Sequence, residues 1–131
     1  MEDQPKNCRR EGFTLIEMMV VISLILILVS IAVPLYNRAI QRAREAVLRQ
    51  NLFTLRQVIS QYTLDKQRAP LSLDDLVKAH YLRHIPVNPL SNQEDWLVEE
   101  EEDPIQQERE ISDVRCGFNG TSSDGTPYES W

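Results

Sequence analysis

An uncharged, strongly apolar run near the N-terminus constrains this chain of 131 residues more than any other feature. From Met18 to Asn37, twenty residues pass without a charge, and eleven of the sixteen residues from Met18 to Val33 are Leu, Ile or Val. As an α-helix, this run would be about 30 Å long, which is roughly the hydrocarbon thickness of a bilayer. Because so short a chain has too little other apolar surface to enclose such a helix, the run predicts a membrane segment.

Three kinds of segment fit this run. A secretory signal peptide would use Arg9 and Arg10 as its basic region and would be cleaved after Ser30-Ile31-Ala32. A plain single-pass anchor is the second possibility, and the third depends on the residues directly before the run. Glu17 is informative here, because a carboxylate at the edge of a bilayer helix is costly and usually has a partner. A signal peptide has no use for it, whereas a solvated Glu17 at the headgroup boundary remains an alternative.

The sequence Gly12-Phe13-Thr14-Leu15-Ile16-Glu17 resembles the processing site of type IV pilins and of the pseudopilins of type II secretion systems. The resemblance implies that a prepilin peptidase cuts between Gly12 and Phe13 on the cytoplasmic side and then N-methylates Phe13. The apolar helix is retained after this cleavage, unlike a signal peptide. The resemblance extends to Pro34, at a position where the family commonly has proline and where a helix kink is expected.

Cleavage would create an ammonium group at Phe13, four residues before Glu17. In a filament of staggered subunits, the carboxylate of Glu17 can meet the ammonium of a neighbouring subunit. Opposite charges attract strongly where the dielectric constant is low, and an unpaired charge there is penalised. The resemblance and this electrostatic argument together predict that Glu17 sets the register of assembly.

Two features depart from the family pattern or leave the orientation open. Glu11 directly precedes Gly12, and an acidic residue there is unusual for the family. Arginines also follow the run on the side that the motif places outside, so the positive-inside rule alone leaves the orientation ambiguous. We assign the orientation from the motif, since the peptidase must meet the leader in the cytoplasm. The arginines are Arg38, Arg42, Arg44 and Arg49.

Beyond the run, apolar residues recur at spacings of three and four, which predicts one face of an α-helix. No glycine interrupts Phe13 to Lys66, so we expect a single helix of 54 residues, about 80 Å long. The apolar face comprises Tyr36, Ile40, Ala43, Val47, Leu48, Leu52, Leu55, Ile59 and Tyr62, and the residues expected mostly away from it are Arg38, Arg42, Glu45, Arg49 and Arg56.

After Pro70, Ser72 is the expected N-cap of a short helix over Leu73–Ala79. The order of features from Tyr62 to Pro89 (a tyrosine-bearing helix end, a proline, a short helix and a Tyr-Leu…Pro…Asn-Pro connection) resembles the type II secretion protein G class. Two short strands are predicted next, at Trp96–Val98 and Ile111–Cys116. The acidic segment Glu99–Glu110 between them predicts a solvated loop that joins antiparallel strands.

The tail from Gly117 to Trp131 is rich in turn residues and resembles the calcium-binding loop of the major pseudopilins. Calcium requires six to eight oxygen ligands. The residues leave two possibilities open, an ordinary turn or a calcium site, and no other cofactor is expected. The ligands of such a site would be Asp124, Asn119 and Asp113, with Ser122 and Ser123 as further oxygen donors.

Several function classes are disfavoured. The net charge of −6 argues against nucleic-acid binding, which usually needs a basic surface. The sequence shows no nucleophile–base pair and no phosphate-binding loop, and His80 and His84 have no third ligand in sight, so we expect no enzymatic activity. Cys8 would leave with the leader, and Cys116 would then have no partner for the disulfide loop that surface pili of this family usually carry.

The sequence as a whole predicts an α+β, pilin-like fold: a long N-terminal helix, transmembrane in its first half, and a small C-terminal domain with a short helix and an antiparallel sheet. The expected segments are a cleaved leader (1–12), a transmembrane or filament-core half (13–36), an amphipathic periplasmic half (37–68) and a small head (69–131). The implied location is the bacterial inner membrane, with a single span and the C-terminal domain in the periplasm.

The implied function is that of a structural pseudopilin of the type II secretion pseudopilus, which supports export of folded proteins across the outer membrane. A type IV pilus subunit is the alternative, and a soluble periplasmic protein with a signal peptide is a more distant one. The implied partners are further copies of the chain in a helical filament, the prepilin peptidase, the inner-membrane secretion platform and the minor pseudopilins.

Overall fold

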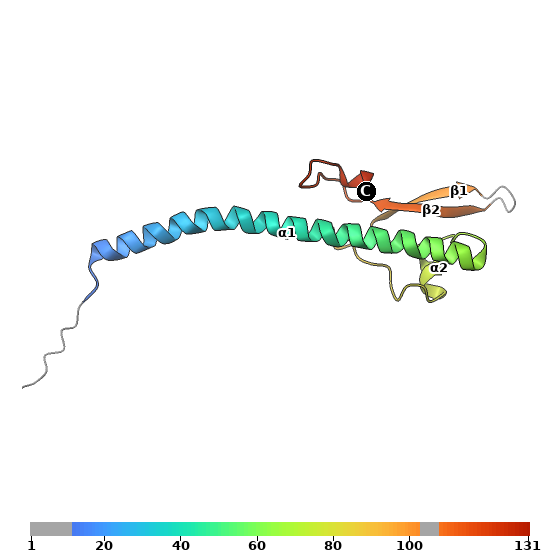
Figure 1. Ribbon diagram of the computed structural model, residues 1–131, viewed down its shortest axis with the longest axis horizontal. Coiled ribbons are helices and arrows are strands. Elements are labelled where there is room, and N and C mark those ends of the chain that lie inside the picture. The colour runs from blue at the N-terminus through green and yellow to red at the C-terminus, as the bar shows by residue number, and fades with distance from the viewer. Residues whose placement is uncertain (1–11, 103–107) are drawn as a thin grey trace, which may run out of the picture. The chain divides into compact units, whose positions relative to one another are not determined.

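The computed structural model describes residues 12–102 and 108–131. The elements follow in the order α1 (Leu15–Lys66), α2 (Leu73–Lys78), β1 (Trp96–Glu102), β2 (Arg109–Cys116) and a short 3-10 turn, η1 (Tyr128–Ser130) (Figure 1). This arrangement confirms the predicted α+β, pilin-like fold. The chain divides into two compact units, one that ends at Asn37 and one that begins at Arg38, and α1 contributes to both.

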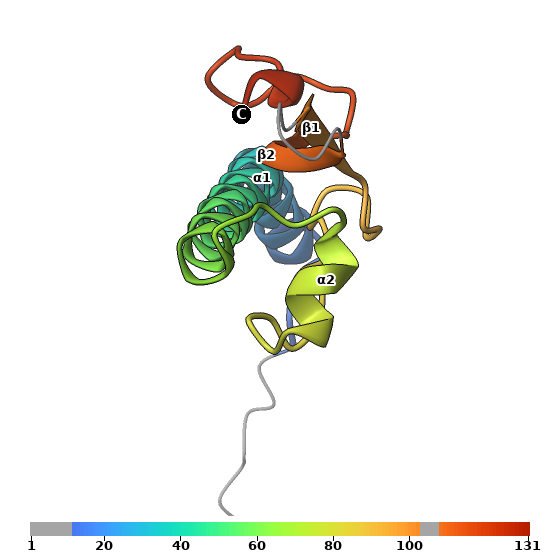
Figure 2. The same cartoon turned by 90° about the vertical axis from the view of Figure 1, so that its right-hand side faces the viewer.

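The C-terminal unit is built on the part of α1 that follows Arg38. The β1–β2 hairpin lies against one side of this helix and α2 lies against another (Figure 2). Their buried side chains form one apolar core, in which Leu76 comes from α2 and Ile111, Val114 and Cys116 come from β2. The residues that α1 buries are Glu45, Leu48, Leu52, Leu55, Ile59 and Tyr62.

The apolar face predicted for α1 is correct from Leu48 onward; before it, Ile40 is half-buried but Ala43 and Val47 are exposed. The buried residues keep alternating spacings of three and four, and this register reaches Glu45 rather than Val47. The side chain of Val47 is 50% exposed, whereas that of Glu45 is only 4% exposed. Glu45 had been placed mostly away from the core. It is buried because the C-terminal loop supplies hydrogen-bond donors to its carboxylate.

A β-bulge explains how β2 directs three side chains into the core. β1 and β2 pair antiparallel, with Trp96 opposite Cys116, and the register shifts between Glu99 and Glu100. Ser112 is the extra residue on β2, because Asp113 pairs with Glu99 and Ile111 pairs with Glu100. At the bulge, the alternation of inward-facing and outward-facing side chains along β2 moves by one position. Ile111, three residues before Val114 rather than two, is therefore buried as well.

Both strands extend further than the sequence predicted. Glu99–Glu102 and Arg109–Glu110 belong to the hairpin, so the prediction of a solvated loop over these residues was wrong. Arginines of β2 compensate the charge of β1. Arg115 lies 2.8 Å from Glu99 and Arg109 lies 3.8 Å from Glu100. The glutamates remain exposed, which also protects this edge strand from pairing with other chains. Residues 103–107 lie outside the described part of the chain.

Residues with positive φ end both helices. Gln67, with φ of 57°, follows the last residue of α1. His80, with φ of 63°, follows the C-cap of α2. The amide of Tyr81 donates to the carbonyl of Leu76 at 2.9 Å, and the amide of His80 donates to the carbonyl of Val77 at 3.1 Å. These two bonds form a Schellman motif. His80 therefore has a backbone role at the end of a helix.

Candidate functional site

The predicted processing site lies just before α1 begins. Gly12 has open space around it, and the Phe13 side chain is 75% exposed. α1 begins at Leu15, two residues after the predicted cleavage position. The Gly12–Phe13 bond thus lies in non-helical chain, as a peptidase requires. Cleavage there and methylation of Phe13 remain predictions.

Thr14 fixes the start of α1, which the sequence analysis missed. Its hydroxyl oxygen accepts a hydrogen bond from the amide of Glu17 at 3.2 Å, and its carbonyl accepts one from the amide of Met18 at 3.2 Å. Thr14 is therefore the N-cap, and Glu17 occupies the third helical position. The signal was present, since Thr-x-x-Glu before an apolar run is typical of a helix start. The Glu17 carboxylate is exposed and close to the positive end of the helix dipole.

The first half of α1 is apolar and exposed throughout. Among the described residues, α1 is the one helix long and apolar enough to cross a membrane, and no residue of its most apolar stretch is buried. The two serines of this half bond to backbone carbonyls within the helix, Ser23 to Met19 and Ser30 to Ile27, each at 2.7 Å. The hydroxyl groups are thereby satisfied without water, as a membrane environment requires.

Pro34 lies within this half, and α1 remains α-helical on both sides of it. Because proline has no amide hydrogen, the carbonyl of Ser30 loses its usual donor. The predicted kink at Pro34 stays a prediction.

A buried carboxylate joins the C-terminal loop to α1. One oxygen of Glu45 accepts hydrogen bonds from the Ser123 amide at 2.8 Å, the Tyr128 hydroxyl at 2.8 Å and the Gln41 side-chain amide at 3.1 Å. The other oxygen accepts one from the Ser123 hydroxyl at 2.5 Å. Burial alone would raise the pKa of Glu45, but the hydrogen bonds from Ser123, Tyr128 and Gln41 outweigh it and hold the pKa below its ordinary value. The carboxylate is therefore charged near neutral pH and clamps the loop to the helix.

Arg49, one turn after Glu45, makes a second attachment. Its guanidinium lies 3.0 Å from the Asp124 carboxylate and 4.1 Å from the centre of the Trp131 ring. The Trp131 ring in turn packs edge-on against Tyr128, at 5.1 Å between ring centres. The C-terminal loop is thus held on α1 by one carboxylate and one arginine, both supplied by the helix.

The residues expected to bind calcium already have protein partners. The Asp113 carboxylate accepts hydrogen bonds from Arg56 at 2.8 Å and from the Val114 amide at 2.7 Å, and Asp124 pairs with Arg49. Asn119 is exposed. Within residues 12–102 and 108–131, no three His, Cys, Asp or Glu side chains gather as a metal site would require. In the structure the loop is a turn stabilised by Gly125 with φ of 81°, and calcium binding stays a prediction.

Cys116 is fully buried, and the Asn88 side-chain amide donates to its sulfur at 3.4 Å. Burial raises the pKa of the thiol, so the thiol stays protonated and unreactive. Cys8 lies outside the described residues.

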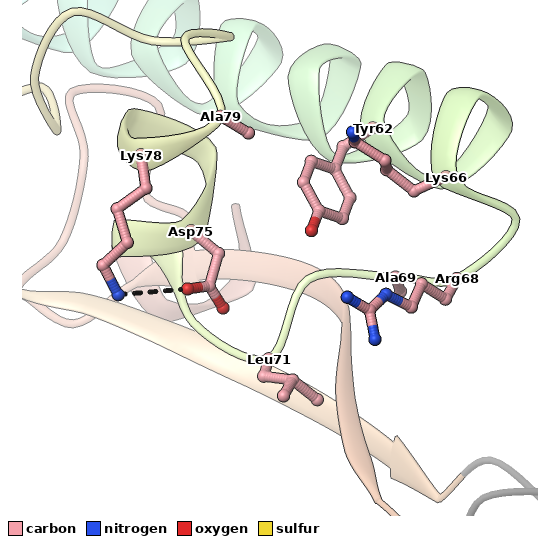
Figure 3. A pocket seen from close by; sticks show the side chains of 8 residues that line it. All are labelled: Tyr62, Lys66, Arg68, Ala69, Leu71, Asp75, Lys78 and Ala79. Atoms are coloured by element: carbon pink, nitrogen blue, oxygen red, sulfur yellow. Dashed lines mark hydrogen bonds and ion pairs between the residues drawn. The ribbon is translucent and has the colours of Figure 1, made fainter.

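A basic hollow of about 390 Å³ lies between the end of α1 and α2. Three cationic side chains line it, those of Lys66, Arg68 and Lys78, with Asp75 as the acidic member. Lys78 pairs with Asp75 at 3.2 Å, while the Tyr62 ring and the Arg68 guanidinium point into the hollow (Figure 3). The side chains that line this hollow have a net positive charge, although the net charge of the whole chain is negative.

The sequence is similar to a known protein family and to a known protein. Residues 7–33 match the family described as the prokaryotic N-terminal methylation motif. Over 73 residues the chain is 33% identical to competence protein ComGC of Halalkalibacterium halodurans, and the match covers 56% of this chain and 72% of that protein. No solved structure matches the chain significantly. The chain therefore belongs to the type IV pilin-like family, a family of structural proteins, and is a membrane-anchored, single-pass member of it.

Proposed function

We propose that this chain is a subunit of a membrane-derived filament, cut between Gly12 and Phe13 by a prepilin peptidase and methylated at Phe13. One observation carries the proposal. A capped helix start with an exposed carboxylate, Thr14 and Glu17, is followed directly by an apolar helix that no other described residue covers. A membrane covers such a helix before assembly, and the same helix of neighbouring subunits covers it afterwards. The C-terminal unit then lies on the periplasmic side.

Glu17 would pair with the ammonium group of Phe13 in a neighbouring subunit. Glu17→Ala is expected to leave the chain folded and inserted, because removal of a carboxylate eases insertion, and to reduce the filament yield strongly. Filaments sheared from cells and quantified against the membrane-bound pool measure this yield.

Thr14→Ala is the matched control for Glu17→Ala. It removes the N-cap but leaves the carboxylate in place, at a cost of about 1 kcal/mol to the helix start. If Thr14→Ala reduces the filament yield as much as Glu17→Ala, the effect comes from the helix start and not from charge pairing. A wild-type yield in Glu17→Ala would also disprove the pairing role.

We further propose that the filament is the pseudopilus of a type II secretion system. The order of features from Tyr62 to Pro89 supports this assignment, as does Cys116, which has no cysteine partner in a chain that has lost Cys8. The similarity to a competence protein favours a second candidate, a pseudopilus that serves DNA uptake. Deletion of the gene distinguishes the two. Secreted enzymes trapped in the periplasm support the first candidate, and lost transformation with normal secretion supports the second. Loss of surface fibres or twitching alone would instead identify a type IV pilus.

A further inference from the structure

Two arginines directly after the apolar run line a polar hollow in the C-terminal unit. The hollow has a volume of about 340 Å³ and is lined by Arg38, Gln41 and Arg42 of α1 and by Ser123 of the C-terminal loop. Arg38 and Arg42 are four residues apart, so they project from the same face of the helix. The Glu45 clamp holds Ser123 in place through both its amide and its hydroxyl group. The side of the hollow that Ser123 forms is thereby fixed to α1.

The described residues do not neutralise the charge of this hollow. Within the described residues, the ion pairs of the C-terminal unit involve neither Arg38 nor Arg42. Like charges four residues apart on a helix repel each other, so the pair is unfavourable until an anion lies between them. Glu45 is the nearest acidic residue on α1. Both of its oxygens are engaged by Ser123, Tyr128 and Gln41.

The position in the sequence indicates which anion. Arg38 and Arg42 follow the end of the apolar run by one and five residues, within the first turn and a half of α1 beyond the run. Tyr36, just before them, is of the residue type that lies at the headgroup level of a bilayer. Phosphate groups of lipids occur at this depth, and guanidinium groups bind phosphate through paired, charge-assisted hydrogen bonds.

We infer that this hollow binds the phosphate of one anionic phospholipid, phosphatidylglycerol being the test case, while the subunit resides in the membrane. The inference rests on the membrane insertion in the proposed function. Lipid binding would explain why arginines follow the apolar run on its outer side, which the positive-inside rule does not explain. The subunit would release the lipid when it leaves the bilayer for the filament, which frees both arginines for contacts within the assembly.

Native mass spectrometry of the full chain tests this inference in neutral detergent micelles that contain a trace of phosphatidylglycerol. Such micelles carry no charged surface, so retention reports a local site rather than general attraction. Arg42→Gln is compared with Arg44→Gln, which removes the same charge two residues away from a side chain that does not line the hollow. Unchanged circular dichroism of both variants verifies the fold.

We expect wild type and Arg44→Gln to retain one phosphatidylglycerol, and Arg42→Gln to retain it roughly tenfold less, as the loss of a charged hydrogen-bond partner implies. Equal retention by the two variants, or equal retention of phosphatidylcholine, would overturn the inference. Displacement of the lipid by inorganic phosphate would also overturn it, since the hollow would then recognise phosphate alone. Absence of the chain from the membrane fraction would refute the proposed function, and the lipid site with it. An inserted chain that retains no phosphatidylglycerol refutes only the lipid site.

Discussion

Replacement of Glu45 by Gln tests the buried clamp between α1 and the C-terminal loop. Gln has the same shape but no charge, and its NH2 group can donate to the Ser123 hydroxyl, which accepts as well as donates. A hydrogen bond to a charged group contributes about 1.5–3 kcal/mol. The Gln oxygen still accepts from the Ser123 amide and the Tyr128 hydroxyl, but these bonds lose the strength that the charge gives them, and the loss is largest at the buried Tyr128 hydroxyl. We therefore expect Glu45→Gln to lower the free energy of unfolding by about 2 kcal/mol.

Thermal unfolding of the full chain in detergent, followed by near-ultraviolet circular dichroism, measures the effect. For a unit of about 90 residues, a loss of about 2 kcal/mol lowers Tm by roughly 8–16 °C. Glu94→Gln removes an equal charge from an exposed side chain and is expected to change stability by less than about 0.5 kcal/mol. Equal Tm values for Glu45→Gln and Glu94→Gln would refute the clamp.

The pH dependence gives a second test of the same clamp. Because the pKa of folded Glu45 lies below its ordinary value of 4.5, the carboxylate stabilises the fold above that pH. The contribution is lost as the pH falls through the folded pKa. The stability difference between wild type and Glu45→Gln should thus be constant at higher pH and shrink below about pH 4.5. A difference that grows on acidification would contradict this electrostatic argument.

Two further predictions concern the turns of the C-terminal unit. His80→Gly should raise the free energy of unfolding by about 1 kcal/mol in the same melting assay, because glycine adopts the positive φ of this position without steric cost; a lower Tm would indicate that the imidazole makes a stabilising contact. If calcium binds the Asp124 loop, it should raise the Tm of wild type but not of Asp124→Asn; identical melting curves with calcium and with chelator would leave the loop an ordinary turn.

Local signals in the sequence predicted the helices well. The absence of glycine and the periodic apolar residues indicated a helix from Phe13 to Lys66, and α1 extends from Leu15 to Lys66. α2 lies within the predicted Leu73–Ala79. These elements depend on composition and spacing within a few turns. A helix can therefore be predicted from its own residues, without knowledge of the residues that pack against it.

Features that depend on distant partners were missed. The glutamates of β1 lie in a strand because arginines of β2, the other strand of the hairpin, compensate their charge. The bulge at Ser112 follows from the pairing of the two strands and has no local sequence signature. Glu45 is different, since its position three residues before Leu48 placed it in register with the core. Its charge obscured that signal, because the donors that make burial favourable come from Ser123 and Tyr128, about eighty residues later.

The intact mass of the mature chain, isolated from both the membranes and the soluble fraction of the native host, shows directly how its N-terminus is processed. We expect a chain that begins at Phe13 and carries one added methyl group, which fragmentation assigns to the amine of Phe13. A chain that begins at Val33 would show a signal peptide cleaved after Ser30-Ile31-Ala32. A chain that retains residues 1–12 would show a plain membrane anchor. Either result would contradict the assignment of this chain as a processed filament subunit.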